Sequence, residues 1–219
     1  MKIISASANS GKGKVEIPVN FLPLKWNDTP LSILKKCARL YCQIWQEPPW
    51  NETFWEEERV LVDMQNELSR TNAAGFIAVY FRALNHYEAD YPEALGSGKA
   101  ATQKLLMVAG FSWGYAVSLP ELNEIAGNEQ LAFLFQNGND RVFYIDELGV
   151  AKEQRGRGIG RELTSRLLRD AQAQGMKLAT LRTDEQALAA RRLYSSLGFK
   201  ELPARDERHP ERTYWLLPQ

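Results

Sequence analysis

A short run rich in glycine and arginine has the residue types of an anion-binding turn. Glycine adopts positive φ without strain and lets a ligand approach the backbone closely. The first N–H groups of a helix have no intrahelical partner, and the helix dipole favours an anion there. The run therefore predicts a phosphate-binding turn, and the alternative is a tight turn whose arginines face solvent. Its members are Arg155, Gly156, Arg157, Gly158, Ile159, Gly160 and Arg161.

The elements around this turn must be a strand before it and a helix after it. Residues 144–150 are aromatic or β-branched in part and contain no proline, which is typical of a strand. Ile159, Leu163, Leu167 and Ala171 recur every four residues with charged residues between them, which predicts an amphipathic helix. The turn is thus expected at a strand-to-helix junction.

The spacing of the glycines excludes two common nucleotide-binding motifs. A dinucleotide fingerprint, G-x-G-x-x-G, fails because Arg161 stands at its last position. A nucleoside-triphosphate loop would fit only near 93–100, where Glu93 and Ala100 replace the first glycine and the metal-binding hydroxyl.

Two other motifs fit, in this order along the chain. Arg155, Gly158 and Gly160 form R-x-x-G-x-G, which resembles the acetyl-coenzyme A motif of the GNAT N-acetyltransferases. Residues 190–199 read ARRLYSSLGF, similar to the A-x-x-L-Y-x-x-x-G-F segment of the same family. A short predicted strand lies between the two motifs, which together span about a quarter of the chain.

The resemblance implies an α/β chain with the GNAT-type acyl-CoA N-acyltransferase fold, a mixed twisted sheet flanked by helices. In that family the strand before the phosphate loop runs parallel to the next strand and splays from it, and the pantetheine arm lies in the gap. A strand-helix-strand order is consistent with such a crossover, but nothing in the residues predicts the splay. We expect one GNAT N-acetyltransferase domain over residues 15–219, after a flexible tail at 1–14.

Acetyl-CoA is accordingly the expected cosubstrate, without a metal. The family resemblance assigns the backbone of Leu148, Gly149 and Val150 to the pantetheine arm and the thioester carbonyl. It also makes Tyr194 the candidate acid, since its hydroxyl would lie beside the coenzyme A sulfur, and a phenol is protonated at neutral pH. The alternative for Tyr194 is a purely packing role on the apolar stripe of its helix.

A carboxylate before the Leu-Gly-Val segment is the candidate base. Glu147 and Asp146 are neighbours on a strand, so alternation predicts that only one faces the cleft, and the resemblance favours Glu147. A base acting through water and a structural carboxylate paired with Arg182 or Arg141 are the alternatives. The family commonly has an asparagine where this chain has Ala187, which puts one coenzyme contact in doubt; Asp184 or Gln186 could replace it.

The acceptor wall is expected between the first two helices, where Trp50 and Trp55 lie among further aromatic and acidic residues. An acidic aromatic wall suits a cationic amine, whereas the alternative is an aromatic packing seam. A small-molecule amine is the favoured acceptor. The rival acceptors are a protein lysine and an N-terminal amine, and the rival class is a non-catalytic acyl-CoA sensor.

Composition restricts the partners and the compartment. Twenty-seven basic and 27 acidic residues cancel, so neither nucleic acid nor an anionic membrane is an expected partner. Cys37 and Cys42 are expected to be buried thiols in a reducing compartment. No secretory core or 18-residue apolar run is found, which predicts a cytoplasmic protein. A homodimer is possible through sheet addition by residues 214–217.

Periodicity and helix-capping residues give the remaining elements. Strands are expected at 15–22, 75–83, 105–117, 141–150, 178–182 and 213–217. Helices are expected at 31–46, 53–69, 120–135, 158–174 and 185–197.

Overall fold

The computed structural model describes residues 17–83, 104–128, 131, 135 and 140–218. The predicted tail at 1–14 and the polar connection at 85–102 lie outside the described residues. Within them, one mixed sheet has the strand order β1-β2-β3-β4-β5-β7-β6. All neighbouring strands are antiparallel except β4 and β5, which are parallel. The strands are β1 (Asn20–Pro23), β2 (Ala74–Ala83), β3 (Lys104–Ser118), β4 (Arg141–Val150), β5 (Leu178–Asp184), β6 (Lys200–Arg205) and β7 (Arg212–Pro218).

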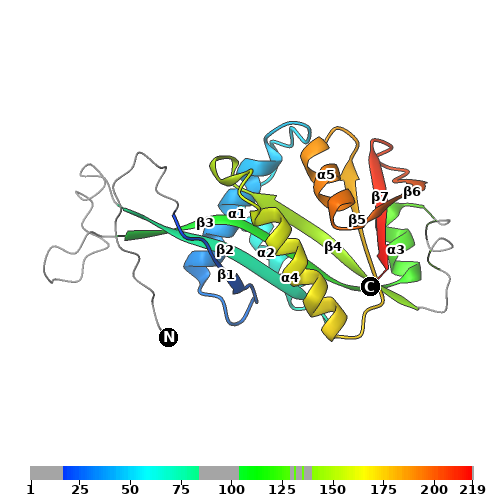
Figure 1. Cartoon of the computed structure of the whole chain (residues 1–219), viewed down its shortest axis with the longest axis horizontal. Helices are drawn as coiled ribbons and strands as arrows, with labels where there is room; N and C mark the ends of the chain where they lie inside the picture. The colour runs from blue at the N-terminus through cyan, green and yellow to red at the C-terminus, as the bar shows by residue number, and fades with distance from the viewer. Residues whose placement is uncertain (1–16, 84–103, 129–130, 132–134, 136–139, 219) are drawn as a thin grey trace, which may run out of the picture.

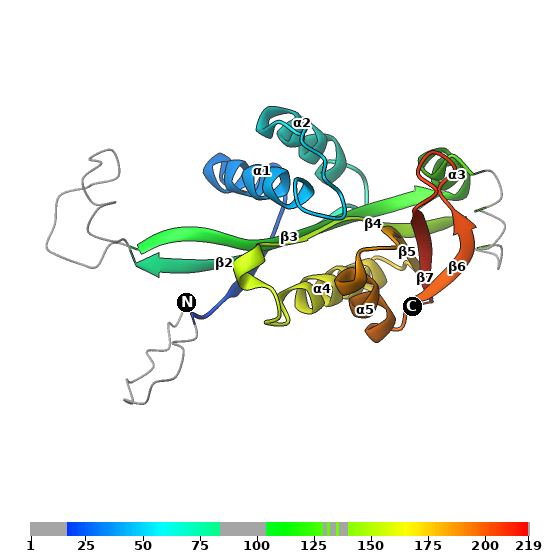
Figure 2. The ribbon, with the colours of Figure 1, turned by 90° about the horizontal axis from the view of Figure 1, so that it is seen from above.

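Helices cover both faces of this sheet (Figure 2). One face carries α1 (Leu31–Trp45) and α2 (Glu57–Leu68), and the other carries α4 (Ile159–Ala173) and α5 (Leu188–Ser196). A short helix α3 (Leu119–Ala126) follows β3, and a 3-10 turn η3 (Lys152–Gln154) follows β4. The predicted mixed sheet flanked by helices is therefore confirmed.

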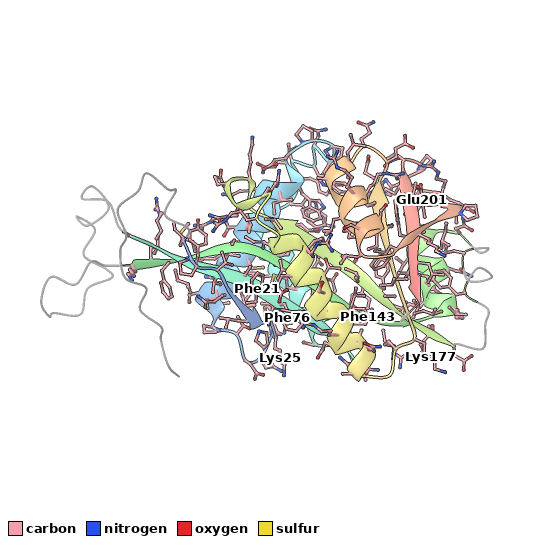
Figure 3. The ribbon with its side chains drawn as sticks, viewed as in Figure 1. Phe21, Lys25, Phe76, Phe143, Lys177 and Glu201 are labelled. Carbon is pink, nitrogen blue, oxygen red and sulfur yellow. The ribbon has the colours of Figure 1, made fainter. Side chains whose placement is uncertain are left out.

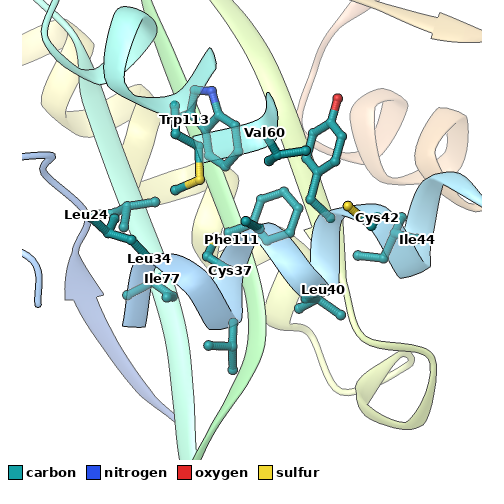
Figure 4. Packing of buried hydrophobic residues seen from close by; sticks show 14 of the residues in the cluster. Leu24, Leu34, Cys37, Leu40, Cys42, Ile44, Val60, Ile77, Phe111 and Trp113 are labelled. Carbon is teal, nitrogen blue, oxygen red and sulfur yellow. The ribbon is translucent and has the colours of Figure 1, made fainter. Parts of the chain in front are cut away.

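The core beneath α1 and α2 is aromatic and aliphatic (Figure 4). Phe111 and Trp113 from β3 pack with Leu34 and Cys37 of α1, and each of these side chains is at most 2% exposed. Burying one large apolar side chain contributes about 1.5–3 kcal/mol to folding. Cys37 and Cys42 are free and buried, as the sequence predicted.

Helix α4 buries the face that its sequence predicted. Ile159, Leu163, Leu167 and Ala171 are at most 3% exposed. Side chains from three strands lie beside this helix, namely Phe21, Phe76 and Phe143 (Figure 3). This packing fixes the position of the helix N-terminus against the end of β4.

Strands β4 and β5 separate after a short paired segment. They pair only at Phe143 with Ala179 and at Tyr144 with Thr180, although β4 continues to Val150. Figure 1 shows the two strands diverging towards the end where α5 lies. The ladder edge of β4 beyond Tyr144 is thereby free from β5, and this gap positions the site described below.

Several predicted elements differ in extent. β1 begins at Asn20, after Pro18, because proline removes a ladder donor. α2 begins at Glu57 rather than residue 53. α3 ends at Ala126, where Gly127 adopts a left-handed conformation with φ of 60°, and most of its predicted remainder lies outside the described residues.

The pairing of the C-terminal strand contradicts the expected route to a homodimer. Strand β6 was not predicted, because its residues are largely charged or exposed. β7 pairs with β5 along one edge and with β6 along the other. The prediction that residues 214–217 could extend a neighbour's sheet is therefore wrong, since both of their edges are already paired.

Candidate active site

A cavity of about 950 Å³ lies where β4 and β5 separate. Its lining comes from the end of α1 and the loop that follows it, the end of β4, the glycine turn with the start of α4, the end of β5, the region leading into and along α5, and Arg212 of β7. The residues that the sequence assigned to catalysis, to the cosubstrate and to the acceptor line this cavity, except Arg157. These residues are Trp50, Trp55, Glu147, Leu148, Gly149, Val150, Arg155, Gly156, Gly158, Ile159, Gly160, Arg161 and Tyr194.

The glycine turn has the backbone that an anion site needs. Gly156 and Gly158 have φ of 76° and 77°, a region that side chains rarely adopt. No atom lies within 4 Å of the position that a Cβ would take at either glycine. Gly158 is the N-cap of α4, and no side chain caps that helix. The turn thus leaves open space beside the positive end of α4, which fits a phosphate group.

The arginines of the turn have different environments. Arg155 donates to Glu47 Oε2 at 2.6 Å and to the Val150 carbonyl at 3.0 Å. Arg161 donates to Ser196 Oγ at 2.6 Å. Arg157 instead donates to the Ile17 carbonyl at 2.9 Å and does not line the cavity. Its side chain acts in the structure as a tie to the segment that precedes β1.

The two neighbouring carboxylates on β4 both line the cavity, so the expectation that only one could face it is wrong. Trp113 is opposite Glu147 and Gly114 is opposite Ile145, which leaves Asp146 as the extra residue of a β-bulge. A bulge interrupts the alternation of side chains along a strand. The irregularity therefore turns Asp146 and Glu147 towards the same space.

Glu147 has one satisfied and one unsatisfied oxygen. Its Oε1 accepts a hydrogen bond from the Tyr41 hydroxyl at 3.1 Å. Its Oε2 is buried and has no hydrogen-bond partner. Burial, followed by the charges of Asp146 and Glu67, raises the pKa of Glu147 well above its usual value.

The alternative role for Glu147, a structural pair with Arg182 or Arg141, is not found among the described side chains. Arg182 instead pairs with Asp206, and Arg141 donates to the Ala116 carbonyl at 3.2 Å. Glu147 is held through Tyr41 rather than by a cation.

Asp146 and Glu67 form a carboxylate cluster with Glu147. The Tyr115 hydroxyl donates to Asp146 Oδ2 at 2.8 Å, and the indole N–H of Trp113 donates to Glu67 Oε2 at 2.6 Å. Burial, with the nearby charge of Asp146, raises the pKa of Glu67 to about 9. At neutral pH this cluster therefore retains at least one proton next to Glu147.

Tyr194 lines the cavity from α5 and is only 6% exposed. Its ring contacts those of Phe199 and Trp215, with centroids 5.9 and 6.5 Å away. Burial, with the charge of Glu147, raises the pKa of the Tyr194 hydroxyl, so the phenol is protonated throughout the neutral range. The ring thus has the packing role considered from the sequence, and its residue also borders the cavity.

The family model described as acetyltransferase (GNAT) family matches residues 32–199 of this chain. The chain belongs to this family. It is accordingly an acetyltransferase that depends on acetyl-CoA, and the match covers every element that lines the cavity except β7. No curated protein matches the sequence.

Solved GNAT structures share the fold at low sequence identity. NAA60 of Arabidopsis thaliana, solved with a bisubstrate analogue, is 16% identical, with a TM-score of 0.56 over 92% of this chain and 99% of that chain. The aminoglycoside N-acetyltransferase AAC(6')-Iy, solved with CoA, is 16% identical, with a TM-score of 0.53 over 86% and 92%. PaiA N-acetyltransferase of Thermoplasma acidophilum, also solved with coenzyme A, is 10% identical, with a TM-score of 0.55 over 93% and 100%.

The loop between α1 and α2 covers one end of the GNAT cavity and is tied at two points. Glu47 pairs with Arg155 of the glycine turn. Glu52 accepts from Arg212 of β7 at 2.9 Å and from the Trp55 indole at 2.6 Å. These bonds hold residues 52 and 55 in the loop, which is why α2 begins later than its sequence predicted.

The GNAT position that departs from the family pattern lies at the entry to α5. Ala187 is the residue before α5 and lines the cavity together with Gln186. Asp184 Oδ1 accepts the backbone N–H of Gln186 at 2.7 Å. The Asp184 carboxylate is therefore engaged by the backbone, and Gln186 is the polar side chain at this part of the lining.

Two contributors to the site were missed from the sequence. Tyr41 is 106 positions from Glu147, and Glu67 reaches Trp113 from α2. Both lie in amphipathic helices whose periodicity indicates only burial or exposure. No local signal in the sequence would have assigned them to the carboxylate cluster.

Among the described residues, none of the helices has both the length and the apolar character that a membrane span requires.

Proposed function

We propose that this GNAT protein transfers the acetyl group of acetyl-CoA directly to the primary amine of a small molecule. The observation that carries the proposal is that one cavity contains the glycine turn, the separated end of β4, Glu147 and Tyr194. In this reaction the acceptor ammonium first gives one proton to a base. The neutral amine nitrogen then gains the acetyl group and loses a second proton, the C–S bond breaks, coenzyme A leaves as the thiol, and one proton per turnover passes to solvent.

The donor end is the glycine turn and the strand that precedes it. Backbone N–H groups after Gly158, with Arg155 and Arg161 beside them, would hold the phosphates. The backbone of residues 148–150 would bind the pantetheine arm along the strand edge left free by β5. When bound, acetyl-CoA supplies an acetyl group activated as a thioester.

Glu147 would accept a proton from the acceptor ammonium, directly or through a water molecule. The raised pKa of Glu147 is closer to the pKa of an amine than the pKa of an exposed glutamate is. Proton transfer from the ammonium to Glu147 is therefore less unfavourable. Tyr41 orients the side chain through its hydroxyl. The base is thereby positioned on β4, beside the residues proposed to bind the donor.

Tyr194 would donate a proton to the departing sulfur. We expect Tyr194→Phe to lower kcat about 100-fold and to leave the Kd for acetyl-CoA within about twofold, because the ring packing survives and only the acidic hydroxyl is lost. Steady-state coenzyme A release and calorimetric binding measure the two effects. Tyr80→Phe, on β2 and outside the cavity lining, is the matched control. Equal kcat in wild type and Tyr194→Phe would remove this residue from the mechanism.

Glu47 places a carboxylate beside the proposed phosphate site. We expect Glu47→Gln to lower the Kd for coenzyme A about threefold to fivefold, because Arg155 is released from an ion pair that is half-exposed and worth about 1 kcal/mol or less. Calorimetric titration measures the change. Glu52→Gln, which alters the other tie of the same loop, should leave that Kd within about twofold. Weaker binding by Glu47→Gln would show that the pair supports the donor site.

The acceptor class is tested by measuring coenzyme A release with separate groups of amines: small monoamines, polyamines, aminoglycosides, amino acids and lysine peptides. A small acceptor is supported by the loop between α1 and α2, which lines the cavity and is tied to the glycine turn through Glu47 and to β7 through Glu52. Efficient acetylation of peptides alone would reject the small-molecule proposal and favour a protein acceptor.

A further inference from the structure

The acceptor end of the cavity has a continuous aromatic wall. The rings of Tyr41 and Trp45 stack with centroids 4.3 Å apart and planes 10° apart. Trp45 and Trp50 stack in the same way at 5.9 Å and 12°. Trp55 meets Tyr41 edge-on at 5.2 Å. All four side chains line the cavity, and Trp45, Trp50 and Trp55 are only partly buried, so part of each indole is available to a ligand.

The charges around this wall are already compensated within the protein. Glu47 pairs with Arg155, and Glu52 pairs with Arg212. The Arg212 guanidinium also lies 5.6 Å from the centre of the Trp50 ring. A ligand with several ammonium groups would have to compete with Arg212 for Glu52, so this part of the cavity rim does not favour a polycation.

One carboxylate oxygen among the residues that line the cavity lacks a hydrogen-bond partner. Among the described residues that line the cavity, Glu147 has the buried carboxylate oxygen without a hydrogen bond, namely Oε2. The other oxygen of Glu147 is bonded to Tyr41, the first ring of the aromatic wall. The unsatisfied oxygen and the aromatic wall are thus connected through the side chain of Glu147.

We infer that the acceptor is a monoamine carried on an aromatic skeleton. This inference rests on the proposed function and specifies its substrate class. The amine binds at Glu147, and the ring of the substrate packs against the accessible parts of the Trp45, Trp50 and Trp55 indoles. The single cation of a monoamine matches the single unsatisfied oxygen of Glu147. The ring of the substrate covers apolar surface of the indoles, whereas a polyhydroxylated or polycationic amine would place its own polar groups against that surface.

The inference is tested with amines that separate charge from ring structure. The probes are 2-phenylethylamine, n-butylamine, spermidine and a short lysine peptide, and the readout is kcat/KM from coenzyme A release. We expect the value for 2-phenylethylamine to exceed each of the others at least tenfold. A higher value for spermidine or the peptide would overturn the inference while leaving acetyl transfer intact.

Removing one ring of the wall provides the second arm of the test. Trp50→Ala should lower kcat/KM for 2-phenylethylamine at least fivefold more than that for n-butylamine, and urea unfolding shows separately that the variant is folded. Phe54→Ala is the matched control, because Phe54 is in the same loop, is 59% exposed and does not line the cavity. An equal loss for both amines would overturn the role of the wall. Failure of the wild type to acetylate any amine, despite binding acetyl-CoA, would reject the proposed function itself.

Discussion

Gly158→Val is expected to raise the Kd for acetyl-CoA about 100-fold or more. Gly158 has a φ of 77°, which a β-branched residue adopts only with strain. The space next to its Cα is open, so the valine methyl groups would occupy the volume proposed for the phosphates. A 100-fold change corresponds to about 2.7 kcal/mol, comparable to the loss of close backbone contacts to an anion.

The chain contains a matched control for this substitution. Gly175, just after α4, has a φ of 82° and also has no atom within 4 Å of the added Cβ, yet it does not line the cavity. Gly175→Val should therefore lower the free energy of unfolding by an amount similar to Gly158→Val and leave the Kd unchanged. Urea unfolding and calorimetric binding of both variants separate strain from lost contacts. Equal Kd values in the two variants would contradict the phosphate site.

Glu147→Gln is expected to lower kcat about 100-fold to 1,000-fold with little change in acetyl-CoA binding, because the amide cannot accept the ammonium proton. The pKa of Glu147 is raised, and only its ionised form is a base. The kcat/KM of the wild type should therefore rise with pH until it passes that raised pKa. In Glu147→Gln this rise should be absent or should reflect only the pKa of the acceptor amine.

Asp146→Asn gives a test of the same group without removing it. Because the negative charge of Asp146 contributes to the raised pKa of Glu147, its removal should move the rise in kcat/KM to lower pH. Stopped-flow or steady-state rates over a pH series measure this shift. A pH profile that is identical in wild type, Asp146→Asn and Glu147→Gln would show that another group is the base.

The sequence was most informative where function depends on the local backbone. The positions of Gly156 and Gly158 predict a turn with positive φ, and the apolar stripe from Ile159 to Ala171 predicts which face α4 buries. Both follow from neighbours along the chain and were found in the structure. The second motif correctly indicated that Tyr194 lies on a helix near this turn.

The remainder of the site depends on contacts between distant parts of the chain. The separation of β4 from β5 and the bulge at Asp146 depend on how whole strands pair. The hydrogen bond from Tyr41 to Glu147 joins a helix to a strand. Local periodicity predicts that helix and that strand but not the contact between them. These features decide which carboxylates face the cavity and where the acceptor can enter, and none has a local sequence signal.

Direct transfer to an amine is tested most directly by following both products of one reaction. Acetyl-CoA is mixed with 2-phenylethylamine, n-butylamine, spermidine or a lysine peptide, and the released thiol and the N-acetylated amine are quantified together, with Gly158→Val as the control. We expect equal amounts of the two products with at least one small amine and a strong reduction of both in the control. Binding of acetyl-CoA without an N-acetylated product from any amine, or release of thiol without that product, would contradict the proposed function.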